Sequence, residues 1–225
     1  MEQERRTHPK VVRKPLPGEH LDSETRLRAE AMIVGAGEDL IQGLLLLTPR
    51  AVNSPEVTMT ETPQRFMTFW KNYVIGEPFD LTIFEDQETA NGYEGMLVKA
   101  GIQVFSFCEH HILPFVGEAI FGYLPGKGLL GLSKIPRLIR MCASGLRTQE
   151  SLTTRVLDIF EEYVQPRGCG LYINARHFCE CYRGVREPFT DTTTVSVRGA
   201  FKDDRSTKAE WEQHWQIAAM RSRLH

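Results

Sequence analysis

The chain is poor in the features that mark several large classes of protein. It has five cysteines among 225 residues, and so sparse and odd a number does not make the disulfide framework of a secreted protein. Its first residues, MEQERRTHPK, show no apolar core of a signal peptide. The longest apolar run, around Leu44–Leu47, is far shorter than the roughly 20 residues that cross a bilayer. We therefore expect a cytoplasmic protein with reduced cysteines and no membrane partner.

An excess of charge of one sign is also lacking. Lys and Arg number 27 against 29 Asp and Glu, which gives a formal net charge of -2. Proteins that coat nucleic acid or an anionic membrane need a clear basic excess, so we expect no nucleic-acid partner. With 41% hydrophobic residues, the chain is long enough to build one large domain, or one domain with an appendage.

Composition and periodicity divide the chain into four predicted parts. Residues 1–22 are charged and interrupted by proline, which is typical of a flexible N-terminal arm. Residues 23–78 are predicted as an N-terminal helical region, with two helical patterns separated by a loop, residues 48–61, rich in Thr, Pro, Asn and Ser. Residues 79–202 are predicted as the main domain, and residues 203–225 as a C-terminal tail with helical spacing.

The main domain alternates between two kinds of pattern. β-branched and aromatic residues with a period near two predict strands, and apolar residues at helical spacing predict two helices among them. The strands are expected at Leu97–Phe107, Phe115–Leu124, Gly168–Arg176 and Thr192–Phe201, and the helices at Ile135–Leu146 and Gln149–Val164. This order predicts an α+β fold with a mainly antiparallel sheet.

Cysteine and histidine gather at the ends of two predicted strands. One cluster is Cys108-Glu109-His110-His111, and the other is His177-Phe178-Cys179-Glu180-Cys181. Cys and His are the ligands that zinc prefers, so the two segments predict a zinc site where they meet in space. In an extended segment residues two apart share a face, and His177, Cys179 and Cys181 would then point together.

Two kinds of zinc site fit this pattern. A structural site closes the metal with four ligands, and the available set is Cys108, His111, Cys179 and Cys181. A catalytic site uses three protein ligands and leaves a fourth position for water. Two histidines remain over and favour catalysis, because imidazole transfers protons near neutral pH; they are His110 and His177.

Two further groups of residues suit a nucleotide. Lys134 and Arg137 lie at the start of a predicted helix, and Arg183 follows the second Cys/His cluster; cations beside a helix N-terminus bind anions such as phosphate. Glu150, after Gln149, begins the next helix, and a carboxylate can accept two hydrogen bonds from N1–H and the 2-amino group of guanine. Solvated surface charges and an ordinary acidic first turn explain the same residues taken singly.

Several motifs in one order resemble the GTP cyclohydrolase I family. They are Ser106-Phe107-Cys108-Glu109-His110-His111 with Pro114-Phe115, Gly131-Leu132-Ser133-Lys134 with Arg137, Gln149-Glu150 with Leu152-Thr153, and His177 and Cys179 with Arg183-Gly184-Val185. The resemblance covers roughly residues 96–201 and, more loosely, the helices before them. Several independent motifs in the same order are more specific than any one of them.

The resemblance implies a fold, an assembly and a reaction. The fold is the tunnelling fold, an antiparallel four-stranded sheet with helices packed on one face, preceded by N-terminal helices. The assembly is a homodecamer of two pentamers with active sites at subunit interfaces. The reaction converts GTP and water to formate and 7,8-dihydroneopterin triphosphate, the first step of pterin biosynthesis. The resemblance leaves open whether folate, tetrahydrobiopterin or a deazapurine is the end product, and whether a regulatory protein binds the ring.

The resemblance also implies a role for individual residues. The zinc ligands would be Cys108, His111 and Cys179, and the proton carriers His110 and His177. Ser133 would lie near the ribose and phosphates, and Glu150, helped by Gln149, would hold the pyrimidine edge of guanine. The triphosphate would be bound by Lys134, Arg137 and Arg183, with Arg65 supplied by a neighbouring subunit.

Three features depart from the family pattern. Cys181 stands where the family usually has an apolar residue, so it would add a thiolate as the fourth ligand if it reached the metal. The segment that links the early helices is longer than usual and holds two Thr-Pro starts, of which Thr62-Pro63-Gln64-Arg65 is assigned as the family motif. The tail after Phe201 continues through Trp211 and Trp215 without recognisable chemistry.

Two rival functions stay in view. One is a catalytically silent relative, stabilised by zinc, that serves as a regulatory or interaction subunit. The other is an enzyme of the same fold that acts on a related purine or pterin. The presence of every expected catalytic side chain speaks against the first, whereas Glu150 reads only one edge of the base and does not exclude the second.

Overall fold

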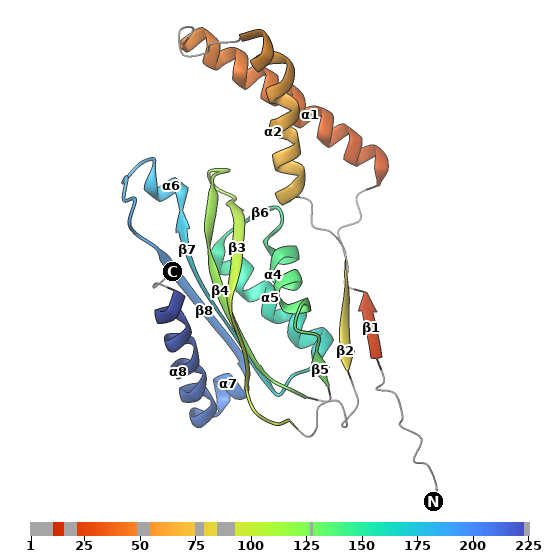
Figure 1. Ribbon diagram of the computed structural model, residues 1–225, viewed down its shortest axis with the longest axis vertical. Coiled ribbons are helices and arrows are strands. Elements are labelled where there is room, and N and C mark those ends of the chain that lie inside the picture. Colours follow the sequence, from red (N-terminus) through yellow and green to blue (C-terminus); the bar gives the residue numbers. More distant parts are fainter. Residues whose placement is uncertain are drawn as a thin grey trace, which may run out of the picture. The chain divides into compact units, whose positions relative to one another are not determined.

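A computed structural model describes residues 11–15, 22–48, 55–74, 79–84, 93–126 and 128–222. The chain divides into two compact units (Figure 1). The larger unit contains residues 1–16 and 77–225, and the smaller contains residues 17–76. Each unit is described by itself below.

A five-stranded sheet forms the centre of the larger unit. Its strand order is β6-β3-β4-β7-β8. β3, β4, β7 and β8 are antiparallel neighbours, and β6 is a two-residue strand parallel to the end of β3. The strands are β3 (Leu97–Cys108), β4 (Pro114–Leu124), β6 (Leu146–Arg147), β7 (Gly168–His177) and β8 (Thr192–Gly199). The predicted combination of helices with a mainly antiparallel sheet is therefore present, with one short parallel strand added.

Two helices cover one face of this sheet and form the main core with it. They are α4 (Lys134–Ala143) and α5 (Gln149–Val164). The hydroxyl of Thr148 accepts a hydrogen bond from the N–H of Ser151 and caps the start of α5, and Gln165 ends it in the left-handed conformation at φ 53°. The apolar side chains that the sheet contributes to this core include Val104, Phe115, Phe121, Leu171 and Ile173.

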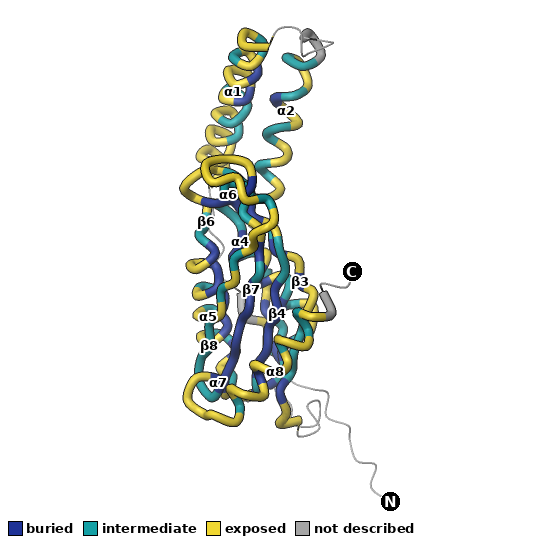
Figure 2. Tube along the Cα trace, turned by 90° about the vertical axis from the view of Figure 1, so that its left-hand side faces the viewer, coloured by how far each residue is buried: buried dark blue, intermediate teal, exposed yellow. Residues whose placement is uncertain are grey.

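The opposite face of the sheet is also covered. α7 (Ala200–Asp203) leads into α8 (Arg205–Ser222), and Figure 1 shows α8 on the other side of the sheet from α4 and α5. Trp211 packs there in a second cluster with Met96, Ile120, Tyr172 and Phe201. The prediction that helices pack on one face only is therefore wrong. The reason lies in the strands, because alternate residues of β4 and β7 are apolar on both faces, and Figure 2 shows both strands largely buried.

A small second sheet joins three segments that are distant in the sequence. β1 (Val11–Pro15) pairs with β2 (Asp80–Phe84), and β2 pairs with β5 (Leu129–Leu130), all antiparallel. Leu81 and Ile83 of β2 point into the main core. β1 lies within the stretch expected as a flexible arm, and it forms a strand because β2 offers it a free edge.

The smaller unit is a pair of helices, α1 (Ser23–Leu47) and α2 (Pro55–Val74). Asp22 caps α1, since its carboxylate accepts the N–H of Thr25 at 2.8 Å. α2 begins at Pro55, inside the segment 48–61 that was predicted as a loop. Among the described residues, no helix has the length and apolar character needed to cross a membrane.

Candidate metal centre and active site

The first Cys/His cluster lies in the tight turn between β3 and β4. The N–H of Cys108 donates to the carbonyl oxygen of Leu113 at 2.9 Å, and the N–H of Ile112 donates back to the carbonyl oxygen of Cys108 at 2.9 Å. Ile112 has φ 54°, a left-handed conformation that a β-branched residue rarely adopts. The turn thus holds its backbone in a strained conformation while it presents His110 and His111 beside the end of β3.

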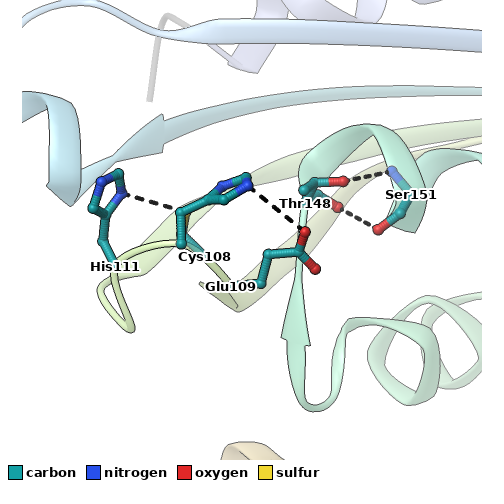
Figure 3. Close-up of polar contacts among 6 residues, drawn as sticks. Cys108, Glu109, His111, Thr148 and Ser151 are labelled. Atoms are coloured by element: carbon teal, nitrogen blue, oxygen red, sulfur yellow. Dashed lines mark hydrogen bonds and ion pairs between the residues drawn. The ribbon is translucent and has the colours of Figure 1, made fainter.

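Both histidines of this turn approach the Cys108 sulfur. The Nδ1 atoms of His110 and His111 each lie 3.8 Å from Cys108 Sγ. Figure 3 shows the contact between His111 and Cys108, with the carboxylate of Glu109 nearby. His110 Nε2 lies 3.8 Å from Glu109 Oε1. His110, one of the two imidazoles beside the Cys108 thiol, therefore has the Glu109 carboxylate as a neighbour.

The second Cys/His cluster is not extended beyond His177. β7 ends at His177, and α6 (Phe178–Cys181) follows at once as a single helical turn, in which the N–H of Tyr182 donates to Phe178 at 3.0 Å. The prediction that His177, Cys179 and Cys181 share one face is therefore wrong, because the alternation of a strand stops where the helix begins. Cys181 Sγ lies 3.9 Å from the carbonyl oxygen of Pro188.

Three side chains converge between the two clusters. Cys108, His177 and Cys179 each offer one ligand atom, and these three atoms lie within 4.8 Å of one another. Burial raises the pKa of the Cys179 thiol, and the neighbouring Cys108 thiol raises it further. Two adjacent thiolates repel each other, and a divalent cation between them would offset that repulsion. Sulfur and imidazole donors at this spacing fit a metal that prefers soft ligands.

His177 is held on two sides. Its ring stacks on Phe115 with centroids 4.7 Å apart and 14° between the planes. Its Nε2 lies 2.9 Å from Oε1 of Gln149. Burial lowers the pKa of His177, while the charges of Glu150 and Glu180 act in the opposite direction. A neutral imidazole is thereby favoured in a fixed orientation next to the two thiols.

Gln149 is an interior residue, although it occupies the first position of α5. Its side chain is 1% exposed. Its amide nitrogen donates to the carbonyl oxygens of Ile173 at 3.1 Å and Thr192 at 2.9 Å, and to Thr194 Oγ1 at 3.1 Å. Glu150, the next residue, is exposed. The two residues expected to share the base edge thus face different surroundings in the described structure.

Comparison with known proteins identifies the family. The GTP cyclohydrolase I family model matches residues 44–216. The chain belongs to the GTP cyclohydrolase I family. The resemblance found in the motifs is thereby confirmed, and the matched region extends well beyond them into both units.

Individual relatives of the GTP cyclohydrolase I family match at similar levels. GTP cyclohydrolase 1 of Hydrogenobaculum sp. is 37% identical over 175 residues, which is 77% of this chain and 94% of that protein. GTP cyclohydrolase 1 of Janthinobacterium sp. is 38% identical over 170 residues, 74% of this chain and 85% of that protein. A solved archaeosine synthase QueF-like structure covers 46% of this chain and 93% of its own, with a TM-score of 0.38 and 13% identity, a likeness too low to bear on fold or function.

The phosphate-binding residues expected of a GTP cyclohydrolase I are not gathered in one place. Arg183 follows α6, and its charge partly opposes the rise in the pKa of Cys179 that burial and Cys108 cause. Lys134, next to Ser133, begins α4, whose other end is fixed beside β3 by a 2.6 Å hydrogen bond from Ser106 to the carbonyl oxygen of Ala143. A helix of 10 residues is roughly 15 Å long at about 1.5 Å per residue. Lys134 therefore lies about one helix length from the end of β3.

The remaining substrate candidates lie in separate surroundings. Arg137 is exposed on the first turns of α4. Arg65 belongs to α2 in the smaller unit and forms an ion pair with Glu61. Glu150 lines an open cavity of about 730 Å³ along the start of α5, together with Arg147 and Ser151. Burial lowers the pKa of His177, and the charge of Glu150 is close enough to oppose this effect.

Two residues that support this site were not predicted as site residues. Phe115 belongs to the family motif Pro114-Phe115, and its stacking on His177 follows from the β4–β7 register, which pairs these two residues. Thr194, on the edge strand β8, accepts a hydrogen bond from the Gln149 amide and also contacts the Thr153 hydroxyl. A strand register is the one signal that would have indicated both contacts, and it depends on long-range pairing that the local pattern does not contain.

Proposed function

We propose that this protein is a zinc-dependent GTP cyclohydrolase. It converts GTP and water to formate and 7,8-dihydroneopterin triphosphate, at the start of pterin biosynthesis. Membership of the family supports the reaction, and the observation that carries it into this chain is the convergence of Cys108, His177 and Cys179. Water-dependent ring opening needs an activated water and groups that move protons, and this end of the sheet has residues for both.

The donor set suits zinc. We propose Cys108 and Cys179 as thiolate ligands. We propose His111 as the imidazole ligand because the family motif assigns it this role; its Nδ1 lies 3.8 Å from Cys108 Sγ, the same distance as Nδ1 of His110. His177 lies in the same group of ligand atoms, so the metal-content experiment below compares the two histidines directly. When bound, zinc supplies a Lewis acid that lowers the pKa of water to about 7.

His110 and His177 are proposed to move protons during opening of the imidazole ring of guanine and release of formate. Imidazole is suited to this near neutral pH. Burial lowers the pKa of His177, which keeps its ring neutral and able to accept a proton. Glu109 Oε1 lies 3.8 Å from His110 Nε2, which places a carboxylate beside this ring.

Guanine is proposed to bind through its pyrimidine edge to Glu150. The carboxylate would accept hydrogen bonds from N1–H and the 2-amino group. Adenine presents an acceptor at N1, and a buried acceptor without a donor costs about 1–3 kcal/mol. The position of Glu150 beside an open cavity and close to His177 supports this assignment.

We propose that the triphosphate site is completed by a second subunit. GTP carries several negative charges, and a protein with net charge -2 must gather cations locally to bind it. Arg183 lies near the thiols, whereas Ser133, Lys134 and Arg137 lie toward the opposite end of α4. This separation within the larger unit supports a site shared between subunits, with Arg65 of α2 as a further cation. Membership of the family supports the tunnelling fold assembled as a homodecamer of two pentamers, with active sites between subunits.

The test is conversion of GTP by the purified, zinc-loaded protein. Formate and, after oxidation and dephosphorylation, fluorescent neopterin are expected from GTP and not from ATP. Absence of both products at full zinc occupancy would point to a silent relative, and turnover of another purine or pterin in place of GTP would point to the second rival.

Single substitutions separate ligands from proton carriers. Cys108→Ala and His111→Ala should remove zinc, as measured by metal analysis. His110→Ala and His177→Ala should keep zinc and lower kcat by about 10²–10⁴-fold. Loss of zinc from His177→Ala with retention in His111→Ala would reverse the two assignments.

A further inference from the structure

The side-chain amide of Gln149 can adopt only one orientation in its surroundings. Its nitrogen lies 3.1 Å from the carbonyl oxygen of Ile173 and 2.9 Å from that of Thr192. Both carbonyl oxygens only accept hydrogen bonds. Rotating the amide by 180° would place its own oxygen against them and leave a buried mismatch. The NH₂ end therefore faces β7 and β8, and Oε1 faces the other way.

This orientation determines which nitrogen of His177 carries hydrogen. Oε1 of Gln149 is an acceptor and lies 2.9 Å from His177 Nε2, so Nε2 must donate. A neutral imidazole has one N–H, and Nδ1 is then left with the free lone pair. The stacked ring of Phe115 limits tilting of the imidazole out of its plane.

Two threonines, one on α5 itself and one on β8, extend this network. Thr153 Oγ1 donates to the backbone carbonyl oxygen of Gln149 at 2.7 Å, and it lies 2.7 Å from Thr194 Oγ1, which also contacts the Gln149 amide. Thr153 is buried on α5, and Thr194 lies on β8. A network satisfied on every side is rigid, and its single outward contact is His177.

We propose that Gln149 is a positioning residue for His177 and does not bind the guanine base. Through one hydrogen bond it sets the orientation of the imidazole, with Nε2–H toward Oε1 of Gln149 and with Nδ1 turned away from the amide. The proposal rests on the proposed function only where it assigns His177 to proton transfer. It replaces the expectation that Gln149 helps Glu150 to hold the pyrimidine edge.

Steady-state kinetics distinguish the two roles. Gln149→Met keeps the length of the side chain and removes both polar ends. We expect kcat to fall by about tenfold or more, a part of the 10²–10⁴-fold or so that an acid–base group contributes. KM for GTP and the preference for GTP over ATP should stay within about twofold. Glu150→Gln should instead raise KM. A raised KM with unchanged kcat in Gln149→Met would overturn the proposal.

A matched variant controls for loss of a buried hydrogen bond as such. In Tyr123→Phe the N–H of Leu130 loses a 3.1 Å partner near the opposite end of β4. Tyr123→Phe should lower thermal stability about as much as Gln149→Met does. Its kcat should stay much closer to that of wild type. An equal fall of kcat in both variants would show a general effect of destabilisation and would contradict a positioning role. If Gln149→Met does not fold, Thr194→Val removes one partner of the amide, and it should lower kcat by a few-fold with KM unchanged.

A spectroscopic measurement needs no turnover. Solid-state NMR of zinc-loaded protein with ¹⁵N-labelled histidine should show, among the ring signals with hydrogen on Nε2, one that disappears in His177→Asn. The same signal should change in Gln149→Met and persist in Tyr123→Phe. If the signal is unaltered in Gln149→Met, the proposal fails even when the enzyme is active. If wild-type protein makes no formate but the signal responds as expected, the proposed function fails and the positioning contact stands.

Discussion

The five cysteines differ in reactivity because their surroundings differ. Burial raises the pKa of Cys142 to about 12 and that of Cys169 to about 12, so both behave as small apolar side chains. Cys108 and Cys179 face each other and His177 in the ligand group. Cys181 is buried against the backbone of Pro188. Cys181 is therefore not expected to supply a fourth ligand.

Cys181→Ala should leave the metal content unchanged at one zinc per chain. The reason is that Cys181 Sγ packs toward the Pro188 carbonyl oxygen, and that it lies outside the group of ligand atoms found among the described residues. Metal analysis of the purified variant checks this, with Cys108→Ala as the variant that should lose zinc. Zinc loss from Cys181→Ala equal to that from Cys108→Ala would instead support a closed, four-ligand site.

At the scale of elements, α8 depends on one large side chain and one cap. Trp211 is 1% exposed and lies over Gly122 and Gly170, which face each other in the β4–β7 register. A Cβ at Gly122 would come within 2.5 Å of the indole. Only glycine at these two positions therefore leaves room for the ring, and α8 docks against the sheet through it.

Trp211→Ala should lower the free energy of unfolding by about 3–5 kcal/mol, because it empties a buried aromatic site. Denaturant unfolding measures this, with Ile217→Ala on the exposed side of α8 as a control that should cost about 0.5 kcal/mol or less. Zinc content should be unchanged, since the Gly122–Gly170 pair lies toward the far end of β4 and β7 from Phe115 and His177. A loss below that of the control would show that α8 does not depend on this contact.

Asp204 makes the stability of α8 depend on pH. Hydrogen bonds from the hydroxyl and N–H of Thr207 hold the pKa of Asp204 below its ordinary value. A lowered pKa means that the cap stabilises the folded state above the unfolded pKa, about 3.9, and that this contribution is lost as the pH falls through the folded pKa. Asp204→Asn keeps a capping oxygen without the charge. The advantage of wild type over this variant in thermal unfolding should shrink below about pH 4, and an advantage constant from pH 3 to 6 would contradict this.

At the scale of the whole molecule, α1 of the smaller unit exposes several large apolar side chains. Leu40, Leu44 and Leu47 follow at spacings of four and three on α1, so they share one face of the helix. They are 52%, 51% and 80% exposed. A contiguous exposed apolar face marks a protein–protein interface. This face supports the proposed oligomer from an observation independent of the divided phosphate-binding residues.

Leu44→Glu should reduce the assembly to smaller species, because it places a charge within this apolar face. Sedimentation velocity measures the change, and Glu38→Gln, at an exposed polar position of the same helix, is the control that should sediment as wild type. GTP turnover should fall together with the loss of assembly if the active sites lie between subunits. An unchanged sedimentation coefficient for Leu44→Glu would exclude this face from the interface.

The sequence by itself determined the chemistry and the family. Cys108, His110, His111, His177 and Cys179 were predicted as candidate site residues because metal and proton chemistry require particular side chains at short spacing, and such spacing is visible in a linear chain. The strands and the helices α4 and α5 were predicted because period two and period 3.6 are local properties. The assignment to GTP cyclohydrolase I was confirmed because several motifs in one order survive wherever a family is preserved.

Only the tertiary structure decided which of these residues meet. The helical turn at Phe178–Cys181 directs Cys181 away from the ligand group, and the β4–β7 register stacks Phe115 on His177. Gln149 changes from a surface residue of a first helical turn to the buried partner of His177 because β7 and β8 surround it. Such contacts join residues more than twenty positions apart, and their energy comes from burial and pairing, which a local sequence pattern does not specify.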